Sequence, residues 1–273
     1  VIAIQENSSI ERAIKLLWSV APTPTMASVR CRCGAVSLTF PTREPVNAFE
    51  CCCVDCYDKL IWSCDKASVQ PPQAFVEHGK HKPLDLRYWP NRLVVKGEEH
   101  LSFNRLREGA TSTNMVTTCC HTLLCVDHPF YQKNVVMMFP EFVPLTGAGE
   151  LIEPPLRVHI ADWPADEYAK LPNKPGTFRQ TNGQRGGSPE AADMMARVGA
   201  VFSKPPPAGP GATFQELLAG AGGIVTNLGL PEGSHSNSVR AFARRRQVAG
   251  AALAIAGAAA SAVAAVAVSR TSR

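Results

Sequence analysis

Ten cysteines, most of them in short hooks, constrain this 273-residue chain more than any other feature. Seven of them fall into three groups with the spacing of metal ligands: Cys31-x-Cys33, Cys51-x-Cys53-x-x-Cys56 and the adjacent pair Cys119-Cys120. A C-x-C or C-x-x-C hook brings two thiolates onto one ion from a single turn, and structural zinc takes four such ligands in a tetrahedron. The spacing therefore predicts that the chain binds zinc.

The first and last groups are expected to combine in one structural zinc site. Cys31, Cys33 and two sulfurs from the region of residues 119–120 would close a four-ligand site and join the first strand to a much later one. Adjacent cysteines rarely point at one ion, so the fourth ligand remains open at this point. The candidates for it are Cys119, His121, Cys125 and His128.

The middle group, Cys51, Cys53 and Cys56, supplies only three ligands and would leave a second zinc with an open position. A catalytic zinc keeps such a position for water or substrate, so these three are the candidate catalytic residues. The acidic residues beside them are expected to be solvated loop charges, and the alternative makes one of them a proton carrier near a zinc-bound thiol. These residues are Glu50, Asp55 and Asp58.

The remaining cysteines are expected to have structural roles. Neither hook needs Cys52 or Cys64, which should be small buried side chains. Cys125 lies in the apolar run Leu123-Leu124-Cys125-Val126 and is expected to be in the core. His128, unless it is a ligand, is expected at a surface turn.

The cysteine pattern indicates the redox compartment. Tight clusters are typical of thiolates that stay reduced as ligands, so we expect a reducing compartment, cytosolic or organellar.

The charge of the chain bears on whether it binds nucleic acid. The formal charge is only +5, from 28 Lys and Arg against 23 Asp and Glu. The densest basic cluster, Arg244-Arg245-Arg246, adjoins an apolar run and does not alternate with aromatic residues. These features argue against a nucleic-acid partner.

Residues 28–163 are predicted to form a mainly β domain. Apolar residues recur there with a period of two, as in Val36-x-Leu38-x-Phe40, and this alternation is typical of strands. The run Lys-Gly-Glu-Glu at residues 96–99 separates two such segments and predicts a β-hairpin. A short helix is predicted over Tyr57–Trp62, directly after the middle hook.

The chain outside this domain has a different composition. Residues 1–27 are expected to be a leader or a non-core extension. Residues 164–246 are rich in Pro and Gly, with short helices predicted over Pro189–Val201 and Phe214–Leu218. Such stretches bury too little apolar area to offset chain entropy, so they are expected to be linkers or to wrap a partner in a protein assembly.

Residues 247–269 are expected to form a C-terminal apolar helix. Val248 to Val268 contain no charge, and arginines flank the run on both sides. Its length fits a bilayer core, which predicts a membrane-spanning or membrane-docked segment and a tethered zinc domain. The alternative is a soluble Ala-rich helix, because alanine gives little transfer energy.

The hooks also resemble those of a known family. The run Cys31-Arg-Cys33-Gly34-Ala35-Val36 precedes the Cys51–Cys56 hook, a Gly97-containing hairpin and the run Cys119-Cys120-His121-Thr122. This order, over residues 28–150, is similar to the glutathione-dependent formaldehyde-activating enzyme and centromere protein V family. The resemblance implies a zinc-binding β-sheet domain of the Mss4-like type. It also implies one structural and one catalytic zinc, and carbon–sulfur lyase chemistry that joins formaldehyde to glutathione.

The chain departs from the family pattern at the later hook. The family has C-x-x-C-G there, whereas Thr117 takes the place of the first cysteine and His121 that of the glycine. The segment after Cys56 also lacks the small polar residues and glycine that many members have. Two functions are therefore carried forward: addition of a thiol such as glutathione to a small aldehyde, or a non-catalytic, zinc-stabilised subunit of a larger, membrane-bound organellar assembly.

Overall fold

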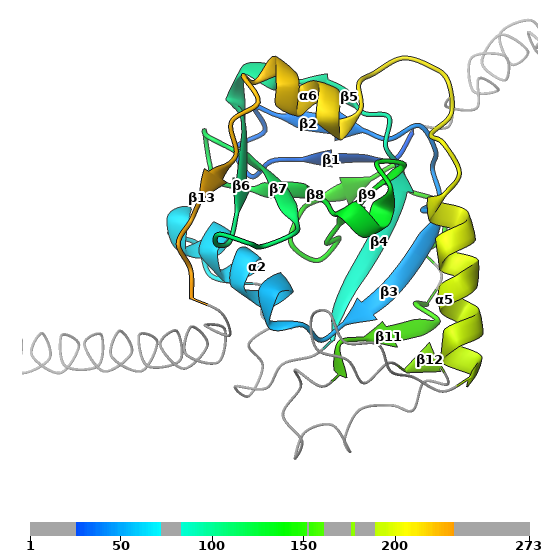
Figure 1. Cartoon of the computed structure of the whole chain (residues 1–273). Helices are drawn as coiled ribbons and strands as arrows, with labels where there is room; N and C mark the ends of the chain where they lie inside the picture. The colour runs from blue at the N-terminus through cyan, green and yellow to red at the C-terminus, as the bar shows by residue number, and fades with distance from the viewer. Residues whose placement is uncertain (1–25, 72–82, 152, 161–175, 178–188, 232–273) are drawn as a thin grey trace, which may run out of the picture.

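The computed structural model describes residues 26–71, 83–151, 153–160, 176–177 and 189–231. Within these residues the chain forms two β-sheets with a few helices on their outside (Figure 1). The prediction of a mainly β fold is confirmed. The expected apolar helix at 247–269 lies outside the described residues, as does the expected leader apart from Met26 and Ala27. Among the residues that are described, no helix is long and apolar enough to cross a membrane.

The smaller sheet is antiparallel and has the strand order β10-β1-β2-β5. Its strands are β1 (Ser28–Arg30), β2 (Ser37–Thr39), β5 (Val94–Lys96) and β10 (Leu145–Thr146). The buried residues Val29 and Leu38 are register partners on β1 and β2, so one face of this sheet is apolar, as the period of two predicts.

The larger sheet has the order β12-β11-β3-β4-β9-β8-β7-β6-β13. Its strands are β3 (Asn47–Cys51), β4 (Leu84–Pro90), β6 (Leu101–Arg105), β7 (Thr113–Thr117), β8 (Leu123–Asp127), β9 (Val135–Met138), β11 (Leu156–Val158), β12 (Gly176–Thr177) and β13 (Thr226–Asn227). The strands from β3 to β6 in this order are antiparallel, and the outer pairs β3–β11, β11–β12 and β6–β13 are parallel. Phe40, just after β2, stacks on Trp89 of β4 with 4.7 Å between the rings, and so packs the two sheets together.

The predicted hairpin at residues 96–99 is wrong. β5 before it pairs with β2 in the smaller sheet, whereas β6 after it pairs with β7 in the larger one. Gly97 adopts φ +75°, and a short 3-10 turn, η2 (Glu98–His100), then leads the chain from one sheet into the other. A Cβ at this position would collide with the carbonyl of Ala35, so the crossing requires glycine.

The helices α2 and α6 begin where the sequence supplies a cap. α2 (Val54–Lys66) contains the predicted segment Tyr57–Trp62 but starts earlier, because the Cys53 side chain accepts a hydrogen bond from the Cys56 amide and caps the helix. α6 (Phe214–Gly220) opens with a capping box between Thr213 and Glu216. α5 (Pro189–Phe202) covers the predicted segment Pro189–Val201.

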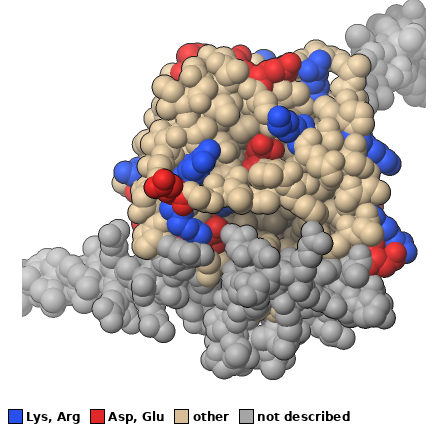
Figure 2. Space-filling model, viewed as in Figure 1, with Lys and Arg blue, Asp and Glu red and all other residues tan. Residues whose placement is uncertain are grey.

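The described part of residues 164–246 packs against the same core as the sheets. Phe202, at the end of α5, is fully buried against Phe49, Tyr88 and Tyr131. Gly211 crosses directly over the backbone of Leu93, which also pairs with Ala212. On the face drawn in Figure 2, Lys and Arg lie scattered among Asp and Glu. The segments around α5 and α6 are therefore part of the folded body and more than linkers.

Phe202→Ala is expected to destabilise the protein strongly. Removing a fully buried aromatic ring leaves a cavity, which costs about 3–5 kcal/mol of unfolding free energy. Ser203→Ala, at the exposed neighbouring position, is the matched control and should change the unfolding free energy by no more than about 0.5 kcal/mol. Chemical denaturation of both variants provides the measurement. Equal stability of the two would contradict the packing of α5 on the core.

Candidate metal centres

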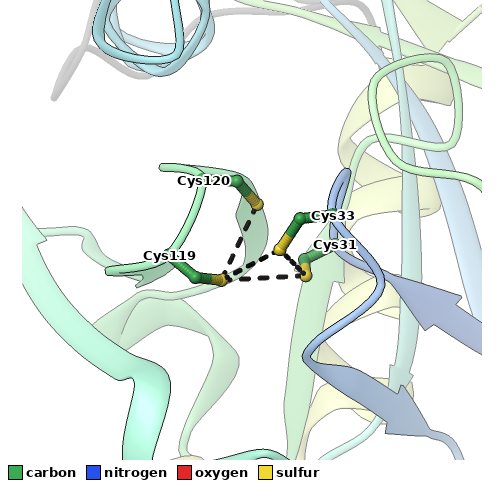
Figure 3. A group of neighbouring side chains, drawn as sticks. All are labelled: Cys31, Cys33, Cys119 and Cys120. Carbon is green, nitrogen blue, oxygen red and sulfur yellow. Dashed lines mark hydrogen bonds between the residues drawn. The ribbon is translucent and has the colours of Figure 1, made fainter.

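The first cysteine cluster joins the two sheets. Cys31 and Cys33 lie in the turn after β1, and Cys119 and Cys120 lie in the turn between β7 and β8 (Figure 3). All four sulfurs lie within 4.8 Å of one another, so the group, here named cluster 1, can hold a metal ion. Because β1 belongs to the smaller sheet and β7 and β8 to the larger one, an ion there would fasten one sheet to the other.

The sulfur separations in cluster 1 fit a tetrahedral thiolate site. The separation is 3.3 Å between Cys33 and Cys119, 3.5 Å between Cys31 and Cys33, and 4.0 Å between Cys31 and Cys119. Cys119 and Cys120 are 3.9 Å apart. Four sulfurs at about 2.3 Å from a zinc ion in a tetrahedron lie about 3.8 Å from each other. The spacing of cluster 1 is therefore compatible with four thiolates around one metal ion.

Two local turns bring the four sulfurs of cluster 1 toward one point. Gly34, at φ +81°, donates its N–H to the Cys31 carbonyl at 2.9 Å and closes the first turn. In the second turn the His121 N–H donates to the Thr117 carbonyl at 2.9 Å, which coils residues 118–120 tightly. This coil lets two adjacent cysteines face one point, contrary to the general expectation for neighbouring residues.

Hydrogen bonds and burial set the protonation of these thiols. Burial raises the pKa of Cys31 and raises that of Cys119 to about 12. Burial opposes ionisation of Cys120 as well, but hydrogen bonds with the hydroxyls of Thr117 and Thr122 lower its pKa to about 5. Cys31 and Cys119 are therefore protonated without a cation, and metal binding must release their protons.

The other candidates for the fourth ligand are not part of the group that can hold the ion. The His121 ring packs edge-on against Trp62, with 6.4 Å between the rings. Cys125 is fully buried and contacts the sulfur of Met115 at 3.8 Å. His128 lines a cavity at the second cysteine cluster. Cys119 and Cys120 are thus the pair that the structure brings to Cys31 and Cys33.

The second cluster, here named cluster 2, lies where β3 meets α2. Cys51 ends β3, Cys53 caps α2 and Cys56 lies in its first turn. The three sulfurs lie within 4.8 Å of one another, and all three residues are buried. The amide of Cys53 donates to the Cys51 sulfur at 3.5 Å, and that of Cys56 to the Cys53 sulfur at 3.3 Å. Such amides stabilise negative charge on sulfur, so the set can hold a metal ion with three ligands.

The three thiols of cluster 2 differ in how readily they ionise. The neighbouring thiols of Cys53 and Cys56, followed by burial, raise the pKa of Cys51 well above its ordinary value. Hydrogen bonds from Cys51 and Cys53 lower the pKa of Cys56, and the positive charge of Lys59 adds to this effect. Cys56 is also in the first turn of a helix, where backbone N–H groups favour an anion. Of the three thiols, Cys56 is therefore the one that ionises most readily.

A cavity of about 340 Å³ opens beside cluster 2. Its lining includes all three cysteines, apolar and aromatic residues such as Tyr88 and Met137, and the polar residues Lys59, Ser112 and His128. A cavity of this size and mixed lining is typical of a site for a small molecule.

The acidic residues beside cluster 2 are not solvated, contrary to expectation. Glu50 binds Arg157 at 2.7 Å, and Asp55 binds Arg107 at 2.8 Å. Asp58 is buried. The ion pairs fix the carboxylates of Glu50 and Asp55 in place against arginines.

Sequence reasoning did not place Lys59, Ser112 or His128 at this cavity, although it named His128 as a candidate ligand of the first site. Lys59 follows Cys56 by three positions, so helical spacing places both on one face, and this signal could have found it. Ser112 and His128 reach the cavity through the pairing of β7 with β8, which no local pattern indicates. The His128 Nδ1 accepts from the Phe130 amide and its Nε2 lies 2.8 Å from the Thr111 hydroxyl, while burial lowers its pKa. His128 is therefore held as a neutral ring.

Cys52 and Cys64 are buried and belong to neither cluster, as predicted.

No family model matches the chain, and neither a curated protein nor a solved structure matches it. Its fold and side chains define a β-rich protein with two cysteine clusters, each of which can hold a metal ion.

Proposed function

We propose that the chain binds zinc at both clusters and that cluster 2 carries carbon–sulfur lyase-type chemistry, adding a thiol such as glutathione to a small aldehyde. One observation carries the proposal: three buried cysteines, one short of a closed zinc site, lie in the wall of a cavity of about 340 Å³. Cluster 1 has all four ligands and takes the structural role. The zinc-stabilised β domain of the Mss4-like type belongs to the same proposal.

A zinc ion held by Cys51, Cys53 and Cys56 would supply Lewis acidity and lower the pKa of a thiol substrate. The chain's own residues position the reactants. Tyr88 and Met137 line the cavity with apolar surface, and Lys59 and Ser112 provide polar contacts. In the addition, the thiol sulfur bonds to the aldehyde carbon, the carbonyl electron pair moves to oxygen, and the thiol proton ends on that oxygen. No oxidation or reduction takes place.

The addition of glutathione to formaldehyde is fast without a catalyst, so the test measures exchange and not yield. NMR exchange spectroscopy follows transfer between free formaldehyde hydrate and S-hydroxymethylglutathione. The metal-loaded protein is expected to raise the exchange rate at least about tenfold, a barrier change of about 1.4 kcal/mol. The same protein stripped of metal and an equal concentration of free zinc are the controls. A rate no higher than that with free zinc would contradict the lyase function.

A further inference from the structure

Lys59 carries a buried charge at the cavity. It lies on α2, three residues after Cys56, and lines the same cavity as cluster 2. Only 3% of the residue is exposed to solvent. Burying an ammonium group costs several kcal/mol unless an anion or a set of hydrogen bonds compensates it. A lysine in this position therefore needs a negative partner.

The described carboxylates do not provide that partner. The ammonium donates one hydrogen bond, to the Ser112 hydroxyl at 3.1 Å, and among the described residues it forms no ion pair. Asp55, the acidic residue that shares the cavity wall, is bound by Arg107 at 2.8 Å. His128 is held neutral and does not compete for an anion. The positive charge is thus directed at the cavity and its sulfurs.

Charge balance makes this lysine useful to a thiolate-binding site. A divalent ion with three thiolates carries one net negative charge, and a fourth thiolate would raise that charge to two. In a buried site such a charge is expensive, whereas one adjacent cation offsets part of it. A neutral fourth ligand adds no charge and needs no such compensation.

We propose that Lys59 is the countercharge that strengthens binding of an anionic sulfur ligand, a small thiolate, at the cluster 2 cavity and has no effect on neutral donors. This inference rests on the proposed function in taking a thiol as the ligand, but it concerns binding and not the addition step. Lys59 is a specificity-determining residue in this proposal. Its position beside Ser112 holds the charge at the wall, so that it acts on whichever ligand enters.

Cobalt-substituted full-length protein provides the test, because thiolate-to-cobalt absorption reports ligands at an open position. Wild type, Lys59→Met and Lys59→Arg are each titrated with 2-mercaptoethanol and, separately, with imidazole. Lys59→Met is expected to bind 2-mercaptoethanol about tenfold more weakly and imidazole unchanged. Lys59→Arg, which keeps the charge, should bind both ligands nearly as wild type does. Cluster 1 already has four sulfurs and should not respond.

Three results would overturn the inference. Equal weakening of both ligands in Lys59→Met would show a structural role, and unchanged thiol binding would show no role. A wild-type chain that binds only one cobalt would also remove its basis, and stoichiometry reveals this before the titrations. Because aldehyde is absent, failure of the lyase function leaves the titrations unaffected: selective thiolate binding without catalysed exchange would reject the lyase and keep the role of Lys59.

Discussion

Cys31→Ser is expected to abolish the cooperative thermal unfolding of the chain. Cys31 is buried in cluster 1, where its sulfur lies near those of Cys33 and Cys119 and accepts the Val36 amide at 3.2 Å. Structural zinc sites contribute on the order of 10 kcal/mol to folding, comparable to the whole stability of a typical domain. Loss of one ligand releases the ion that joins the two sheets, so the smaller sheet should detach.

The matched control is Cys125→Ala, which removes a fully buried cysteine that belongs to neither cluster. This variant should lose about 1–2 kcal/mol of unfolding free energy and keep one sharp thermal unfolding transition. Differential scanning calorimetry compares the two variants with wild type. If Cys31→Ser loses its metal and still melts within a few degrees of wild type, cluster 1 does not hold the sheets together.

Cys53→Ser is expected to have the opposite effect, with the fold kept and function lost. Serine is a favoured N-cap residue, so its hydroxyl can replace the Cys53 sulfur as acceptor for the Cys56 amide and keep the start of α2. The hydroxyl is a poor ligand for zinc, and cluster 2 then has only two thiolates. We expect one metal equivalent fewer per chain and formaldehyde exchange at the rate of the metal-free protein.

Calorimetry, metal analysis and NMR exchange on the same Cys53→Ser sample test this division of roles. Cys52→Ser, next to the cluster but outside it, controls for a change at a neighbouring buried cysteine. Loss of folding in Cys53→Ser to the extent seen in Cys31→Ser would contradict the assignment of separate structural and catalytic sites.

The hooks could be predicted from sequence because their geometry is local. Cys51, Cys53 and Cys56 converge through one strand end and the first turn of one helix, and residue spacing alone indicates this. The meeting of Cys31 with Cys119 depends on how two sheets pack, which spacing suggests but does not determine. That Cys119 and Cys120 can both face one ion became clear only from the tight turn between Thr117 and His121.

The strands were predictable from alternation, but their partners were not. The segments on either side of Gly97 were predicted to form a hairpin, but β5 pairs with β2 and β6 with β7, so they belong to different sheets. The role of His128 was missed for the same reason, because it enters the cavity through pairing distant in sequence. Ionic partners such as Arg157 for Glu50, far apart in the chain, likewise leave no local pattern.

The zinc content of the purified full-length chain, measured by elemental analysis against protein concentration, tests the two-site assignment most directly. Cluster 1 and cluster 2 together predict two zinc ions per chain. One zinc per chain would mean that cluster 2 does not hold the ion on which the proposed lyase depends, and would favour a non-catalytic, zinc-stabilised subunit. A folded chain with no zinc would contradict the metal-binding role of both clusters.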